Sequence, residues 1–184
     1  TNRTNTIGAL VFGGPPPPPP PPPTVTTTGS SAVTRSTATA SGDITPVSSP
    51  VTESGICWST TANPTTSDAH LATSPLVSSG PFNVNITGLL AGTLYHYRAY
   101  AINGVGTGYG ADLTFTTDAA ILPTVTTTNA SAITAISAAS GGNVSDDGGS
   151  PVTQRGITWN TAGSPVITAD PFSSNGTGTG SFNS

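Results

Sequence analysis

Apolar and polar residues alternate in short runs along most of the chain after residue 23. The clearest run is LYHYRAYA at 94–101, where every second residue lies on one apolar face: Tyr95, Tyr97, Ala99 and Ala101. A second run of this kind covers residues 82–86. Alternation with a period of two is typical of strands that bury one face, and Gly, Asn and Pro between the runs indicate turns. The pattern predicts an all-β protein.

Residues 24–118 divide into seven expected strands. We place them at 25–33, 36–44, 51–59, 70–77, 82–86, 94–101 and 112–117. The Gly-rich stretch GVGTGYG before the last strand is expected to be a hairpin loop, since it lacks the spacing of a phosphate loop. Alternation would gather one set of aromatic side chains between two sheets: Trp58, Phe82, Tyr95, Tyr97 and Phe115. His96, Arg98 and Tyr100 would face outward.

The chain repeats itself with a period of about one hundred residues. PTVTTT occurs at 23–28 and at 123–128, and SPVTESGICWST at 49–60 is matched by SPVTQRGITWNT at 150–161. A third pair is SSGPFN at 78–83 and GTGSFN at 178–183. Each copy has the size of an immunoglobulin-like sandwich, and Trp159 and Phe182 are the expected core residues of the second copy.

The second copy reaches Ser184 before any counterpart of the strands at 94–101 and 112–117. We therefore expect residues 119–184 to form a sandwich that lacks its last two strands and leaves sheet edges open. Two explanations stay open. Another copy could donate a strand, or the chain could be part of a longer repeat protein whose following residues supply both strands. A single donated strand would replace only one of the two.

The stretch TGLLAGTLYHYRAYAINGVGTGYG at 87–110 is similar to the E–F–G portion of fibronectin type III-like modules. Leu89, Gly92, Thr93 and Tyr95 match the motif before strand F, and Ala91 replaces its usual Pro. With the repeats, residues 23–184 resemble tandem modules of large secreted bacterial surface proteins, including adhesins. The resemblance implies tandem immunoglobulin-like sandwiches, an extracellular cell-surface setting, and a Tyr95 hydroxyl that returns to nearby backbone. It names no binding partner, because this fold hosts many functions.

Nine consecutive prolines occupy residues 15–23. They predict a polyproline II spacer of roughly 28 Å. Residues 1–14 before it contain an apolar run of strand length, which would serve as a donor strand or an anchor through Ile7, Leu10, Val11 and Phe12. The expected organisation is thus 1–14, spacer 15–23, sandwich 24–118 and incomplete sandwich 119–184.

Charge excludes some partners. Only 7% of the residues are charged, there is no Lys, and the net charge is -4. The four Arg residues are scattered, so we expect no nucleic-acid partner. No apolar run approaches the roughly 20 residues of a membrane span. The single cysteine, Cys57, corresponds to Thr158 in the second copy and is expected to be a strand residue and not a nucleophile.

Few residues suggest chemistry. His70 and His96 are the only histidines, so we expect no metal site, no cofactor and no enzymatic activity. Asp146 and Asp147 fit a turn. Five asparagines begin an N-x-Ser/Thr sequon and are candidate glycosylation sites: Asn2, Asn85, Asn129, Asn143 and Asn175. For a bacterial source we expect O-linked sugars on Thr runs instead.

The sequence favours a non-catalytic structural subunit or repeat of an extracellular fibre or adhesin. Its expected partners are other copies of itself, head to tail, or neighbouring repeats, with a surface glycan or a host or capsid protein as further candidates. One alternative is a virion appendage with a capsid anchor at residues 1–14. Another is a carbohydrate-binding module, for which Tyr100 and Tyr109 are the candidate exposed aromatics.

Overall fold

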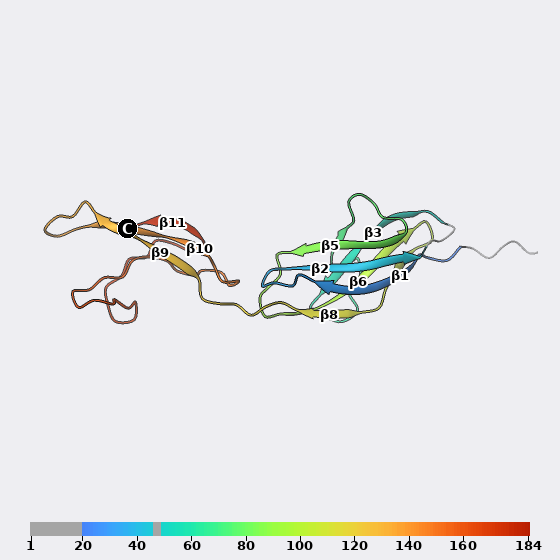
Figure 1. Ribbon diagram of the computed structural model, residues 1–184, viewed down its shortest axis with the longest axis horizontal. Coiled ribbons are helices and arrows are strands. Elements are labelled where there is room, and N and C mark those ends of the chain that lie inside the picture. Colours follow the sequence, from blue (N-terminus) through green and yellow to red (C-terminus); the bar gives the residue numbers. More distant parts are fainter. Residues whose placement is uncertain (1–19, 46–48) are drawn as a thin grey trace, which may run out of the picture.

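The computed structural model describes residues 20–45 and 49–184. Within these ranges the chain consists of antiparallel strands and connecting loops without a helix, which confirms the all-β prediction. Figure 1 shows two groups of strands that follow one another along the long axis. We call residues 24–118 the N-terminal sandwich and residues 124–184 the C-terminal unit.

The N-terminal sandwich is made of two sheets. The first has the order β1 (Thr24–Ser31), β2 (Thr37–Thr45) and β5 (Gly80–Thr87). The second has the order β4 (Ala69–Ala72), β3 (Val51–Ser59), β6 (Leu94–Asn103) and β7 (Thr107–Tyr109), and β8 (Leu113–Thr116) also pairs with β6. β6 is therefore the central strand of the larger sheet.

The core lies between these sheets and holds the aromatic residues that alternation placed there. Phe82, Tyr95, Tyr97 and Phe115 are buried, and Trp58 is partly buried against them. The Phe115 ring lies 5.7 Å from that of Tyr95 and 5.5 Å from that of Tyr97, between centroids. The Tyr95 hydroxyl accepts a hydrogen bond from the Leu90 amide at 3.1 Å, so the ring is fixed to the chain just before β6.

Two strands differ from the sequence expectation. β4 covers Ala69–Ala72 and not 70–77. The Gly-rich stretch expected to be only a loop contains β7, which pairs Tyr109 with Tyr100, whereas β8 pairs Leu113 with Tyr97. The segment between β7 and β8 therefore has one residue more than the facing part of β6, which makes a bulge near Gly110. Because of this bulge, residues 107–116 pair with β6 as two short strands, β7 and β8.

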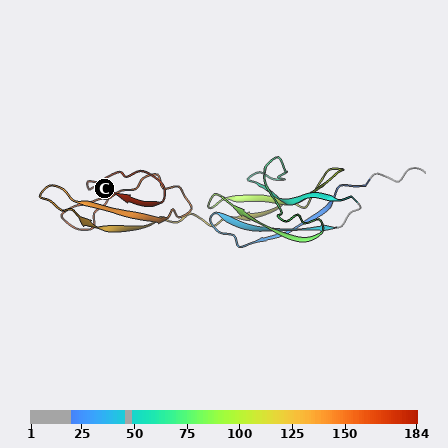
Figure 2. The same ribbon diagram turned by 90° about the horizontal axis from the view of Figure 1, so that it is seen from above.

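The C-terminal unit repeats the smaller sheet of the sandwich. Its strands β9 (Thr124–Ser131), β10 (Ala139–Asp146) and β11 (Gly180–Asn183) have the order β11-β10-β9, which matches β5-β2-β1. Residues 152–160, the counterpart of β3, form only an isolated bridge between Thr158 and Phe172. In Figure 2 these residues belong to the loops that lie against the sheet. β3 pairs along its length with β6, and residues 124–184 contain no counterpart of β6.

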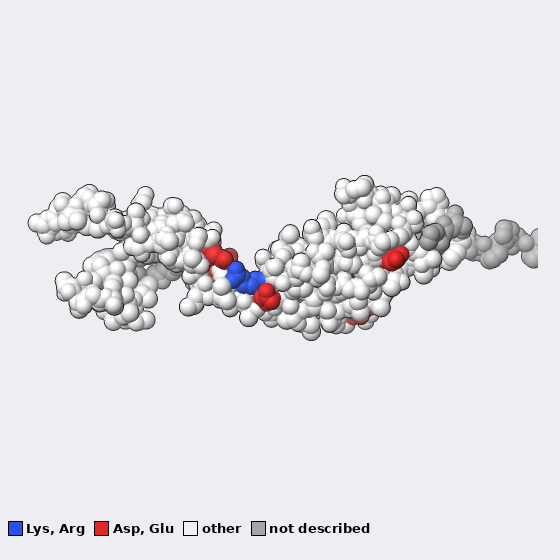
Figure 3. All heavy atoms as spheres, viewed as in Figure 1, with Lys and Arg blue, Asp and Glu red and all other residues white. Residues whose placement is uncertain are grey.

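The two groups of strands meet at a short polar joint. Arg35 forms an ion pair with Asp146 at 2.9 Å, and the Ile121 amide donates to the Gly148 carbonyl at 2.8 Å. The Asp146 carboxylate also accepts the Gly148 amide at 2.7 Å, and this bond holds the pKa of Asp146 below its ordinary value. Figure 3 shows charged side chains gathered at this joint, whereas the rest of the C-terminal unit is uncharged on the face in view.

We predict that Gly42→Ala destabilises the N-terminal sandwich. A Cβ at Gly42 would lie 2.6 Å from the Ala99 Cβ and 2.7 Å from Cζ of Phe82, so the two sheets would have to separate. Overpacking of this kind costs about 1–3 kcal/mol. Urea unfolding measures the change. Gly104→Ala is the matched control, because its Cβ would meet nothing within 4 Å. Equal stability of the two variants would contradict the prediction.

Candidate functional site

The most distinctive surface of the molecule is an apolar trough over the inner face of the C-terminal sheet. One hollow of about 220 Å³ is lined chiefly by Val125, Val144, Val152, Ile157, Phe172 and Phe182. A second, of about 560 Å³, extends it along Ile136, Ile157 and Trp159. Ile157 lines both hollows, and we call the two together the open trough.

The walls of the open trough correspond to core positions of the N-terminal sandwich. Val125, Val144, Val152, Ile157 and Phe182 match five residues that are buried there: Val25, Ile44, Val51, Ile56 and Phe82. The strand register is also the same, since Val125 pairs with Val144 as Val25 pairs with Ile44. Val25 is only 8% exposed, whereas Val125 is 54% exposed. The difference arises because β6 and β8 cover the smaller sheet only in the N-terminal sandwich.

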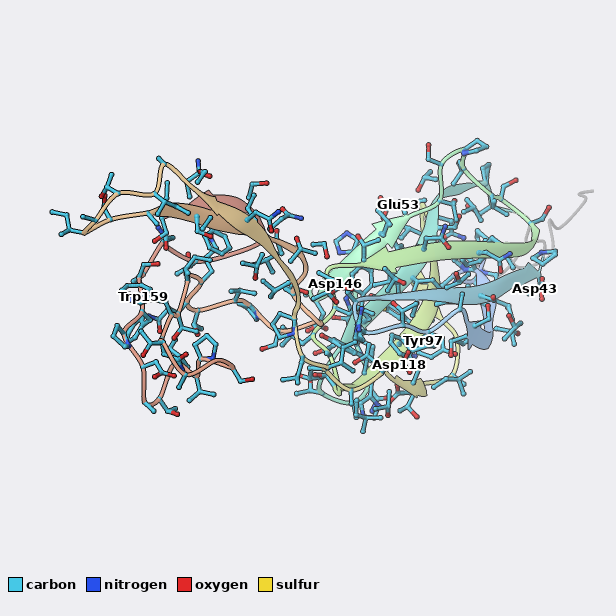
Figure 4. The ribbon with its side chains drawn as sticks, turned by 60° about the vertical axis from the view of Figure 1, so that its left-hand side comes forward. Asp43, Glu53, Tyr97, Asp118, Asp146 and Trp159 are labelled. Atoms are coloured by element: carbon cyan, nitrogen blue, oxygen red, sulfur yellow. The ribbon has the colours of Figure 1, made fainter. Side chains whose placement is uncertain are left out.

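Trp159 shows the same effect and corrects a sequence expectation. Its counterpart Trp58 packs partly buried beside Tyr97 of β6, but Trp159 is 49% exposed and does not belong to a closed core. Figure 4 shows Trp159 on the loop layer that faces the C-terminal sheet. Phe182, the other expected core residue of this unit, is buried under the guanidinium group of Arg155, which lies 5.6 Å from the ring centroid.

Arg155 also holds one wall of the trough in place, the segment 152–158 that faces the C-terminal sheet. Its Nη1 donates to the carbonyls of Thr179 at 2.7 Å and Gly180 at 3.1 Å, which links this wall to the start of β11. Its backbone amide donates to Gly176, and its carbonyl accepts from Asn175. The amides of Gln154, Gly156 and Thr158 point to the opposite edge of this segment, away from residues 171–178. They have no acceptor among the described residues. The wall thus offers unpaired backbone donors beside an apolar surface, which is what an added strand requires.

The two aromatics expected on the outer surface are covered to different extents. Tyr100, expected to be exposed, is 0% exposed, because its hydroxyl donates to Glu53 at 2.8 Å and the His70 ring covers it edge-on. Burial is the main reason that the pKa of Tyr100 is raised. The Tyr109 ring is partly covered by the Arg98 guanidinium at 4.7 Å. Tyr100 therefore offers no free face for sugar stacking, and one face of the Tyr109 ring is occupied by Arg98.

Other candidate residues are scattered. His96 contacts Asp112 at 3.0 Å, while His70 contacts the Asp68 carbonyl. Within the described ranges no group of three His, Cys, Asp or Glu could hold a metal ion, and no helix is long and apolar enough to cross a membrane.

The structure separates the sequon asparagines into two groups. Asn85 and Asn129 are exposed on strands, whereas Asn143 and Asn175 are partly buried and hydrogen-bonded to Ser181 and Ser173. Asn2 lies outside the described residues. The expected assembly residues also lie outside them: Ile7, Leu10, Val11 and Phe12.

No protein-family model matches this chain, and a search of curated proteins finds no match either. The resemblance to fibronectin type III-like modules therefore stays a prediction.

We predict that Cys57 does not react with thiol reagents while the N-terminal sandwich is folded. The side chain is fully buried and its Sγ–H donates to the Pro64 carbonyl. Burial raises the pKa of the thiol to about 11, so at pH 8 it stays protonated and its nucleophilic thiolate is scarce. Ellman's reagent should label the protein at pH 8 only after denaturant is added. Rapid labelling of the folded protein would show that the site opens.

We also predict faster hydrogen exchange in the trough wall than in β3. In dilute solution the amides of Gln154, Gly156 and Thr158 should exchange at least about 100-fold faster than the counterpart amides in β3, because only the latter face β6. Exchange followed by NMR measures this. Addition of a peptide with the sequence of β6 should slow exchange at these positions, and a peptide with Asp in place of Tyr97 and Ala99 should not. Equal protection of both segments in the monomer would contradict the geometry described above.

Proposed function

We propose that this chain is a non-catalytic structural module of an extracellular fibre or adhesin, built from tandem fibronectin type III-like sandwiches. The three-on-five arrangement of strands supports the sandwich type, and so does the Tyr95 hydroxyl bonded to the Leu90 amide. The observation that carries the proposal is the open trough, a surface of core positions that stays partly exposed, above all at Val125 and Trp159. Such a surface suits assembly better than catalysis.

The occupant that best fits the trough is a β-strand. A small molecule could cover the apolar side chains but would leave the amides of Gln154, Gly156 and Thr158 unpaired. A strand inserted beside them would satisfy those amides and place alternate side chains on Val125, Ile157 and Phe182. It would take the position that β6 has in the N-terminal sandwich.

We take residues 6–12 of a second copy as the donor. The chain enters the N-terminal sandwich at the end opposite to the C-terminal unit, as Figures 1 and 2 show. From Phe12 to Pro20 there are eight residues, which span at most about 29 Å. To reach the trough of its own chain, the segment would have to run back along the whole N-terminal sandwich. β6 alone is about 33 Å long, since it has ten residues. A copy therefore cannot reach its own trough, and donation to the next copy produces an open, head-to-tail fibre.

Two other sources of the strand define the competing proposals. Residues that follow Ser184 in a longer chain would make the trough the seat of its own next strands, as in a long repeat adhesin. A capsid protein as the partner of residues 6–12 would instead make the chain a virion appendage. A carbohydrate-binding module is less well supported, because Tyr100 is buried.

The intact mass of the polypeptide from its native source separates the first two cases. A mass equal to that of the 184-residue chain would require the strand to come from another molecule. A much larger mass would favour strands supplied by the same chain. Either result is compatible with a structural module, whereas co-purifying hydrolytic activity would contradict a non-catalytic role.

We predict that Val11→Asp abolishes polymers of this chain and leaves the N-terminal sandwich folded. A carboxylate on the inward face of the donor strand would lose its hydration among the apolar side chains of the trough, which costs several kcal/mol. The nearby Arg155 guanidinium already donates to the carbonyls of Thr179 and Gly180. Light scattering after size exclusion measures polymer mass. Val105→Asp is the matched control, since Val105 is exposed in the β6–β7 loop. Polymers that persist in Val11→Asp would eliminate residues 6–12 as the donor.

A further inference from the structure

We infer that the hairpin joining β6 to β7 is a docking site for the end of the proline run, and that it fixes the direction in which the preceding segment leaves the N-terminal sandwich. The docking site consists of Asn103, Gly106 and Gly108, and its occupant is Pro21–Pro23. This inference goes beyond the proposed function and does not depend on what fills the open trough.

The buried side chain of Asn103 makes the polar contact. Its Nδ2 donates to the Pro21 carbonyl at 3.2 Å, while its Oδ1 accepts from the amides of Val105 at 2.9 Å and Gly106 at 3.1 Å. A proline has no amide hydrogen, so its carbonyl is the only backbone group through which it can be held. Asn103 therefore shapes the turn with one end of its amide and binds the proline run with the other.

Glycine provides the space for the rest of the contact. A Cβ at Gly108 would lie 1.8 Å from the Pro23 carbonyl oxygen, and Pro23 itself is buried. At Gly106 a Cβ would lie 3.9 Å from Cγ of Pro22, which is ordinary packing distance. Any side chain at position 108 would displace the backbone of Pro23. This requirement explains the glycine at position 108.

The consequence is mechanical. A polyproline segment is semi-rigid over several residues, so holding its last residues limits the angle at which it leaves. Pro20–Pro23 extend from the sandwich at the end away from the C-terminal unit, roughly along the long axis (Figure 1). The docked hairpin thus sets the direction in which the chain leaves the sandwich at Pro20, away from the C-terminal unit.

Pulsed electron–electron resonance tests the inference. Spin labels are placed at Gly14→Cys, just before the prolines, and at Thr114→Cys, an exposed position on β8. The buried Cys57 is expected to stay unlabelled. All measurements use the Val11→Asp background at low concentration, so the result reports a single chain and is separate from any failure of strand donation. The unsubstituted hairpin should give a narrow distance distribution.

Two variants remove the contact in different ways. Asn103→Asp keeps the acceptor for the turn amides but loses the donor to Pro21, and Gly108→Ala removes the space for Pro23. Each should widen the distribution by about twofold or more as the segment is released. Gly104→Ala, in the same hairpin, should leave it narrow. If Gly108→Ala unfolds the sandwich, Asn103→Asp alone decides. A broad distribution without any hairpin substitution, or an unchanged one in Asn103→Asp, would overturn the inference.

Discussion

The packing of β6 is the interaction on which the rest of the structure depends. This strand pairs with β3 along one edge and with β7 and β8 along the other. Its inward residues, Tyr95, Tyr97, Ala99 and Ala101, cover the smaller sheet. One strand therefore supplies both the hydrogen bonds that define the larger sheet and much of the apolar surface that closes the core.

The C-terminal unit shows what the same sequence pattern does without such a strand. β9 and β10 still pair in the register of β1 and β2, since their hydrogen bonds are satisfied within one sheet. Val125 is nevertheless exposed, and residues 152–160 form no strand although they closely match β3. Whether such a segment forms a strand thus depends on its neighbouring strands as much as on its own residues, which agrees with the strong context dependence of β propensity.

This dependence explains how far the sequence could predict the structure. The bounds of β3 and the burial of Phe82, Tyr95, Tyr97 and Phe115 follow from local alternation, which records which face meets the core. Trp159 was expected in a core because its local sequence matches that of Trp58. Its burial, however, requires a counterpart of β6, which residues 124–184 do not contain. Tyr100 was expected outside for a similar reason. Its parity does point away from the core, yet Glu53 and His70 of neighbouring strands cover it, and no pattern within 94–101 contains that information.

The shape of the trough limits which strand can fill it. In the N-terminal sandwich the two sheets approach closely where Gly42 faces Ala99, and the Phe82 ring lies across the same glycine. Gly142 and Phe182 repeat this arrangement in the C-terminal unit. A strand added there must, like β6, carry a small residue opposite Gly142. Residues 6–12 have a small residue on one parity, with Ala9 between Ile7 and Val11. In the proposed assembly Ala9 would face Gly142 and pair with Ile157, as Ala99 pairs with Ile56, and Val11 would point to the same apolar side. A charge at position 11 therefore opposes assembly more strongly than one on the opposite face of the donor.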